Sequence, residues 1–299
     1  ETMMTRATLF LMLAGALAAS SGPCPAAGPA GVEFVAAEDE VRVLIGGTHV
    51  TSYLHGAALT KPVLYPVSTL GGVALTRGYP LAKIEGETTD HPHHVGIFFT
   101  YDEVNDQGFW NNTTTPPQIR HVETKAMEGG AERGRLETLS RWIAKDGATV
   151  VLEESRAMVF QPLAGGYSID IDIVLTAKTK VVFTDTKEGM FAIRTADWLR
   201  EKNGTGKYTS SEGGTSSKEI WGRRARWVAL EGDKEGAKVG IAIMHHPSSV
   251  NYPTYWHARD YGLFSANPLG QAAFQQGTGV ADPTPLELTR VPVAELGLV

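Results

Sequence analysis

The stretch Tyr167-Ser168-Ile169-Asp170-Ile171-Asp172-Ile173-Val174-Leu175 alternates between apolar and polar side chains over most of its length. Successive side chains of a β-strand point to opposite faces, so the isoleucines share one face while the serine and the aspartates share the other. This period of two predicts a strand with one buried face.

The same alternation recurs along the chain, with Gly, Asp and Asn between the runs. The further runs are Glu40–Ile45, Arg135–Ile143, Val150–Phe160, Met190–Trp198, Arg226–Leu230 and Val239–Met244. Many short strands with little helical periodicity predict an all-β protein, a large antiparallel β-sandwich. No change of composition divides residues 32–299, which we expect to form a single β-sandwich domain. The Pro- and Gly-rich tail after Gly277 leaves open whether the last strand of that domain is present.

Two other segments have a distinctive composition. Residues 202–218 are rich in Gly, Ser and Thr, which predicts a long exposed loop or a flap over a site. At the N-terminus, a short basic start and an apolar run ending in Ala16-Leu17-Ala18 predict a signal peptide over residues 1–19. Residues 20–31 are then a flexible leader, and the mature protein is periplasmic or secreted. A retained N-terminal anchor is the alternative interpretation.

Charge and cysteine content narrow the class of protein. The formal net charge of −6 argues against a general nucleic-acid binder, although Arg223, Arg224 and Arg226 could form a local basic patch. The simpler interpretation is that they form the polar face of a strand. The single cysteine, Cys24, excludes an intramolecular disulfide, so packing must supply the stability. We expect no membrane interaction beyond signal-peptide targeting.

The densest group of chemically active side chains is Asp90-His91-Pro92-His93-His94-Val95-Gly96. Histidine suits proton transfer near neutral pH and is also the commonest metal ligand. A strand running from His93 would place His93 and His94 on opposite faces, which argues against a metal site formed by this segment alone. Acid–base chemistry or substrate hydrogen bonding is the favoured interpretation. A divalent metal ion bound by His91, His93 and the distant His246 is the minority alternative, and purely structural histidines are another.

A second group, Asp185-Thr186-Lys187-Glu188-Gly189-Met190, precedes Arg194. Such dense opposite charges often form a solvated turn. The functional interpretation is that Glu188 acts as a base or acid beside Lys187 or Arg194.

The third group is His245-His246-Pro247 and the aromatic run Tyr252–Gly262. Tyr255, Trp256 and His257 are amphipathic and suit a platform for a sugar ring, with Trp110 as a further stacking residue. A packed connection whose polar atoms are all satisfied is the alternative.

At these residues the chain resembles the DUF6807 family of mostly secreted bacterial proteins, often labelled methane oxygenases. The resemblance rests on the following segments: 76–80, 90–96, 185–191, 221–227, 246–247, 253–259, 261–264 and 266–268. A methane monooxygenase is not expected, because the mature chain has no run of about 20 apolar residues to span a membrane. A weaker likeness, of pattern only, to the aldose-epimerase sandwich implies a galactose-mutarotase-like supersandwich in which a His and a Glu act at a sugar carbon.

We therefore expect a carbohydrate-active protein that carries out epimerisation, elimination or hydrolysis at a sugar carbon. His91 or His246 would be the acid and Glu188 the base. The expected substrate-binding residues are Arg77, His94, Trp110, Arg194, Tyr255, Trp256 and His257. No cofactor is predicted, and the expected partner is a carbohydrate or other small polar ligand rather than a nucleic acid. The alternatives are a non-catalytic carbohydrate-binding protein and a metal-dependent hydrolase or oxygenase.

Overall fold

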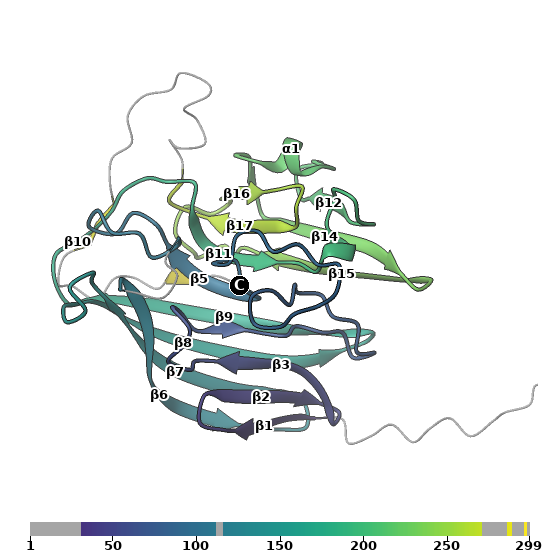
Figure 1. The fold of residues 1–299 in the computed structure, drawn as a ribbon, viewed down its shortest axis with the longest axis horizontal. Helices are drawn as coiled ribbons and strands as arrows, with labels where there is room; N and C mark the ends of the chain where they lie inside the picture. Colours follow the sequence, from purple (N-terminus) through teal and green to yellow (C-terminus); the bar gives the residue numbers. More distant parts are fainter. Residues whose placement is uncertain (1–30, 112–115, 271–285, 289–295, 298–299) are drawn as a thin grey trace, which may run out of the picture.

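The computed structural model describes residues 31–111 and 116–270, together with the backbone of two short strands at 286–288 and 296–297. The regular secondary structure of the described chain is almost entirely strand, every strand pairing in it is antiparallel, and two large sheets form the body of the molecule (Figure 1). The prediction of an all-β sandwich is confirmed. The predicted signal peptide, the leader up to residue 30 and most of the tail after Gly277 lie outside the described residues.

The larger sheet has nine strands, and its order brings together segments from both ends of the described chain. The order is β1 (Val32–Ala36), β2 (Glu40–Ile45), β3 (Thr48–Leu54), β4 (Val63–Leu64), β5 (Ile97–Tyr101), β11 (Gly189–Arg194), β17 (Leu263–Asn267), β16 (Thr254–Ala258) and β13 (Arg224–Ala225). The three central strands β5, β11 and β17 thus come from three distant parts of the sequence.

The second large sheet has five strands in the order β19 (Leu296–Gly297), β9 (Gly166–Ala177), β8 (Val150–Leu163), β7 (Gly134–Ile143) and β6 (Gln118–Glu128). The alternating stretch of the sequence is therefore β9, as predicted. Two small sheets complete the described strands: β12 (Lys207–Ser210), β14 (Trp227–Lys234) and β15 (Ala237–Met244), and β10 (Val181–Phe183) with β18 (Leu286–Leu288).

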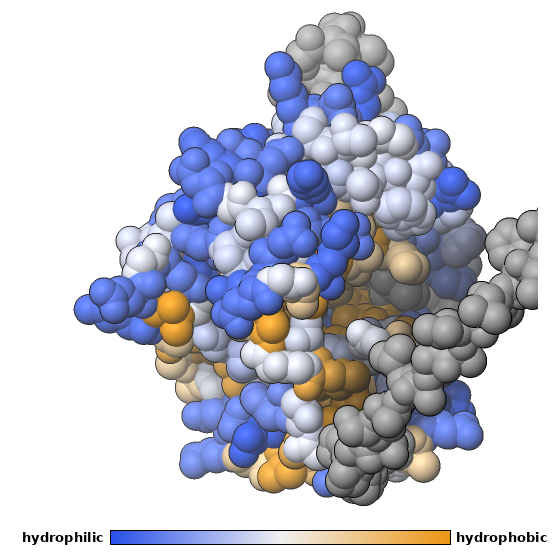
Figure 2. Space-filling model, turned by 90° about the vertical axis from the view of Figure 1, so that its right-hand side faces the viewer, coloured by the Kyte–Doolittle hydropathy of each residue, from blue (hydrophilic) through white to orange (hydrophobic). Residues whose placement is uncertain are grey.

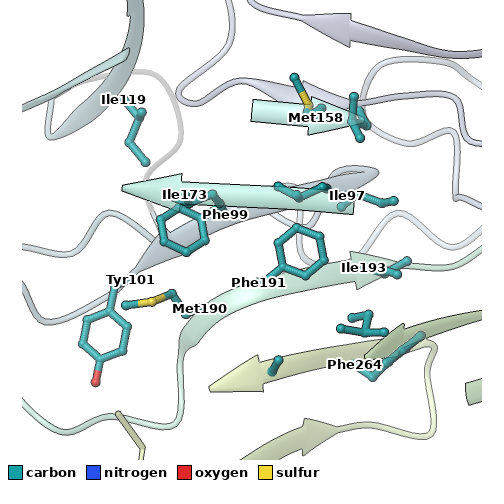
Figure 3. Packing of buried hydrophobic residues seen from close by; sticks show 14 of the residues in the cluster. Ile97, Phe99, Tyr101, Ile119, Met158, Ile173, Met190, Phe191, Ile193 and Phe264 are labelled. Carbon is teal, nitrogen blue, oxygen red and sulfur yellow. The ribbon is translucent and has the colours of Figure 1, made fainter. Parts of the chain in front are cut away.

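The core lies between the two large sheets. In the close view of Figure 3, Phe99, Phe191 and Ile193 of the larger sheet face Met158 and Ile173 of the smaller one. These side chains are almost completely buried. Each removes enough apolar surface from water to contribute about 1.5–3 kcal/mol.

Helices are confined to the 3₁₀ turn η1 (Asp197–Leu199) and the single-turn helix α1 (Ser217–Ile220) in the described chain. Neither they nor any other described segment form an apolar helix of membrane-spanning length. The expected loop or flap over residues 202–218 is wrong in part, because it contains β12 and the first residues of α1. Tyr208 of β12 is fully buried and its hydroxyl donates to the carbonyl oxygens of Arg259 (3.0 Å) and Leu263 (3.2 Å), which holds this segment against the sheet.

Candidate functional site

A row of paired residues crosses the outer face of the nine-stranded sheet, the face turned away from the core. Val63 pairs with Phe98, Phe98 with Ala192, Ala192 with Ser265, and Ser265 with His257. Residues directly opposite one another on paired strands share a face. The two small side chains in the middle of this row, Ala192 and Ser265, leave room for a large group above them.

Trp110 lies over this face. Its ring is 5.1 Å from Phe98, 5.5 Å from His94 and 6.4 Å from His257, measured between ring centroids. It packs in the same cluster as Phe98 and Ala192 and is fully buried. Trp110 therefore joins the histidine turn before β5 to His257 on β16.

The histidine segment is a tight turn rather than the start of a strand. The amide of His94 donates to the carbonyl of His91 (3.0 Å), His91 has a φ of 42°, and β5 begins only at Ile97. Gly96, with a φ of 58°, allows the close approach to β4, because a Cβ there would lie 2.2 Å from the carbonyl oxygen of Leu64. Only glycine fits this position without displacing the backbone.

This turn corrects the expectation that strand alternation separates the imidazoles. The ring of His91 stacks on that of His94 at 5.0 Å, and His93 lies 4.2 Å from His94 and 5.8 Å from His91. Pro92 and the positive φ of His91 fold the segment back on itself, so the period-two rule does not apply to it. All three imidazoles form one group.

Two buried arginines hold the turn in place through Asp90. One carboxylate oxygen, Oδ1, accepts from Nη1 of Arg77 (2.6 Å) and from Nη2 of Arg194 (2.7 Å), and Arg77 Nη2 also donates to the carbonyl of His91 (3.1 Å). Both guanidinium groups are completely buried, whereas the Asp90 side chain is 42% exposed. Burial acts to raise the pKa of Asp90, but Arg194, Arg77 and the neighbouring His91 outweigh it, so the net pKa is lowered. Arg77 and Arg194 thus anchor the histidine turn through Asp90 and the carbonyl of His91.

Tyr261 closes the arrangement on the side of the arginines. Its ring stacks on His91 at 4.8 Å, and the guanidinium carbon of Arg194 lies 4.7 Å from the ring centroid. Burial raises the pKa of Tyr261, Arg259 and Arg194 act to lower it, and Glu188 acts to raise it. Contacts thus run from Tyr261 through His91, His94 and Trp110 to His257 and Glu188, and we call this group of side chains the arc.

Glu188 and His257 stand at the other end of the arc. Oε2 of Glu188 lies 3.6 Å from Nδ1 of His257, and Oε1 forms an ion pair with Lys187. Burial, with Lys187 and Arg259, lowers the pKa of His257 to about 3, so this imidazole is neutral at neutral pH. A carboxylate and a neutral imidazole thus adjoin on a largely buried surface.

Lys61 adds a charge that the sequence analysis missed. Its Nζ donates to the backbone carbonyl of Trp110 (3.3 Å) and lies 5.4 Å from the ring centroid of Phe98. Burial lowers the pKa of this lysine to about 7, although Asp102 acts to raise it. The available signal was a lysine immediately before the apolar residues Pro62-Val63-Leu64.

Burial also keeps His93 and His94 neutral. It lowers the pKa of His93 to about 4, assisted by Lys61 and His91, and lowers that of His94 well below its ordinary value. Within the described residues, the two ring nitrogens of His94 and the indole nitrogen of Trp110 have no hydrogen-bond partner. Buried polar atoms are normally paired, so these three atoms are exceptions that call for an explanation.

The model of a family of unknown function, DUF6807, matches residues 40–294 and therefore includes every residue of this arc. The chain belongs to the DUF6807 family. Comparisons with curated proteins and with solved structures gave no match.

In this DUF6807 protein, most of the residues singled out from the sequence lie on the arc. The residues brought together are Arg77, His91, His93, His94, Trp110, Glu188, Arg194 and His257. Asp90, Tyr261 and Lys61 join them. These residues come from loops and strands that are up to about two hundred positions apart in the sequence.

Three residues singled out from the sequence lie elsewhere in the DUF6807 protein. His246 is exposed after β15, where Nδ1 contacts the hydroxyl of Ser248 at 2.7 Å. Trp256 is fully buried in the main core and its indole donates to the carbonyl of Ala225 (2.9 Å). Tyr255 shares the strand face of His257, but its ring packs under the guanidinium of Arg224 at 5.3 Å.

The arc of the DUF6807 protein offers neutral imidazoles, a carboxylate and aromatic surfaces to a ligand. Within the described residues, no three His, Cys, Asp or Glu side chains converge in a way that could hold a metal ion. What the arc can do is donate and accept hydrogen bonds and move a proton between Glu188 and a bound hydroxyl or carbon.

Proposed function

We propose that the arc from Tyr261 to Glu188 binds a carbohydrate and carries out acid–base chemistry at one of its carbons. The reaction class is epimerisation, elimination or hydrolysis, each of which requires one group to take a proton and another to give one. The observation that carries this proposal is the contact between Glu188 and His257, 3.6 Å apart, at the end of a continuous run of aromatic and imidazole rings.

The rings support the choice of a sugar. Sugars combine apolar C–H faces with hydroxyl groups, and amphipathic aromatic rings offer both an apolar face and a polar edge. His91, His94 and Tyr261 stack nearly parallel, with interplanar angles of 4° to 13°. The unpaired nitrogens of His94 and Trp110 would then bond to hydroxyl groups.

Glu188 is the base in this proposal. It faces the neutral imidazole of His257 and is paired with Lys187, two contacts that fix its orientation. His91 is the acid, because Nδ1 lies 3.4 Å from the carboxylate of Asp90 and the ring side chain is 39% exposed. A carboxylate beside an imidazole nitrogen orients the ring. His246, the other acid expected from the sequence, is not given this role here because it is exposed and lies outside the arc.

The test begins with binding. The protein is screened against mono- and oligosaccharides by thermal unfolding, and each ligand is then assayed for turnover. A ligand present at about 100 times its Kd stabilises the folded state by about 2.7 kcal/mol, which raises Tm by several degrees.

The variant Glu188→Gln separates chemistry from binding. We expect it to retain the ligand-induced rise in Tm and to lose turnover by about 10²–10⁴-fold, the usual contribution of a general base. Glu212→Gln is the matched control, because Glu212 is an exposed carboxylate paired with Arg226 at 3.4 Å. Equal turnover in both variants would contradict the role of Glu188. Sugar binding without any turnover would favour a non-catalytic carbohydrate-binding protein.

A further inference from the structure

A cleft of about 410 Å³ opens between the sheets at the start of β9 and along β15. Figure 2 views this end of the molecule and shows apolar residues inside a hollow between its upper and lower halves. The volume falls within the range of ligand-binding clefts, about 300–1,000 Å³.

The residues that line this cleft show that it lies against the edges of two strands. Every residue from Gly165 to Ile171 and every residue from Lys238 to Met244 takes part. A groove over one face of a strand would be lined by alternate residues only, since successive side chains point to opposite faces. Contact with consecutive residues means that the backbone edge of each strand borders the cleft.

Both edges lack a neighbouring strand there, within the part of the chain that the structure describes. β15 is the last strand of its sheet and pairs only with β14. β9 pairs with β8 along its length, and on its other side it pairs with β19 only at Ile173 and Asp172. Unpaired strand edges present free N–H and C=O groups to any segment that lies beside them.

The floor of the cleft is apolar. Leu75, Ile97, Phe191 and Ile193 reach it from the core of the larger sheet, and the last three lie together in Figure 3. The residues of the two walls that carry apolar side chains are Tyr167, Ile169, Ile171, Val239, Ile241, Ala242, Ile243 and Met244. Lys238 and Asp170 are the charged residues of the lining.

We propose that this edge cleft binds an extended peptide segment of a partner protein, which adds as a β-strand between β9 and β15. Apolar side chains at alternate positions of the segment would face the floor, and its backbone would pair with the two edges. The position of β19 supports this mode, because β19 already adds to the same edge of β9 next to the cleft. An acyl chain would fill the apolar volume but leave both backbone edges without partners. The proposal is independent of the carbohydrate site on the opposite face of the sheet.

Amide hydrogen exchange of the full chain tests the proposal directly. The probe is an end-blocked synthetic peptide of alternating valine and lysine. In the extended conformation its valines lie on one face and its lysines, which keep it soluble, lie on the other. At about 100 times its Kd, exchange of the amides that face the free edges within residues 166–171 and 239–243 should slow by about 100-fold, because these amides exchange from the unbound form. A peptide of the same composition with its valines in one block should give no protection.

Two further controls distinguish the possible occupants. A probe N-methylated at alternate residues should lose binding if backbone pairing is required. Ile241→Asp should weaken binding of the unmodified probe by at least tenfold, whereas Val122→Asp, at an exposed position of β6 outside the cleft, should not. The proposal is overturned if laurate competes with the probe without protecting the edge amides, since an acyl ligand is then the occupant. It is also overturned if the probe does not bind, or if the edge amides are already protected in the free protein, because the chain itself then covers the cleft.

Discussion

The two faces of strands β5, β11, β16 and β17 are both buried, yet they carry side chains of different polarity. The core face carries Ile97, Phe99, Phe191 and Ile193, which are apolar and pack against the second sheet. The outer face carries Phe98, Ala192, Arg194, Ser265 and His257, of which three are polar or charged. Burial alone therefore does not identify the site. What identifies it is the burial of polar groups, which is unfavourable unless they are paired or serve a ligand.

The first prediction concerns the core face, where the largest effect on stability is expected. Phe191→Ala leaves a cavity between the sheets and should lower the free energy of unfolding by about 3–5 kcal/mol, measured by urea denaturation. Once folded, the variant should bind the same sugars as the parent protein, because its neighbour on the outer face, Ala192, is unchanged. A loss smaller than about 1 kcal/mol would mean that the two faces do not differ in their contribution to stability.

The sequence was sufficient to predict the strands that have one solvated face, but not the orientation of the strands that are buried on both faces. Alternation located β2, β7, β8, β9, β14 and β15, because one face of each is solvated or packs differently from the other. The run Met190–Trp198 also located β11, although that strand ends at Arg194. The strands β5, β11, β16 and β17 are buried on both faces, so their sequences contain no polar face to mark orientation. This is why Trp256 could be interpreted as a binding residue although it packs in the core.

Local backbone geometry accounts for the remaining differences. The turn at His91–His94 depends on a positive φ at His91, a conformation that residue type does not reveal at that position. The composition of residues 202–218 is that of a loop, and only the burial of Tyr208 shows why a strand forms inside it. The proximity of Glu188 to His257 arises from pairing between β11, β17 and β16, which are distant in sequence.

The second prediction uses pH to compare the faces. The pKa of His257 falls from about 6.5 in the unfolded chain to about 3 in the folded one, so the unfolded state binds more protons between these values. Stability should therefore decrease as the pH falls below about 6.5, by up to about 1.4 kcal/mol per pH unit for this group. The core-face side chains carry no such group and contribute nothing to this slope.

His257→Gln isolates the contribution of that histidine. Between pH 7.5 and pH 5, the parent protein should lose about 2 kcal/mol more of its unfolding free energy than the variant does. Urea denaturation at the two pH values measures the difference, and His246→Gln, at an exposed histidine, is the control that should follow the parent. Parallel pH profiles for the parent and His257→Gln would show that His257 is not held neutral by the fold.

The last prediction has the smallest expected effect and defines where the site ends on the outer face. Tyr255 lies two residues before His257 on the same strand face, and Arg224 covers its ring at 5.3 Å. Arg224 also donates to the backbone carbonyls of Pro253 (2.7 Å) and Asn251 (2.9 Å). If Arg224 serves only to make these structural contacts, Arg224→Ala should lower stability by about 1–2 kcal/mol, the usual contribution of an exposed cation–π contact together with exposed hydrogen bonds. Affinity for a sugar ligand, measured by calorimetry, should then be unchanged. A change of affinity by a factor of ten or more, without a larger loss of stability, would extend the arc from His257 to Tyr255, and the outer face would then function along the whole length of β16.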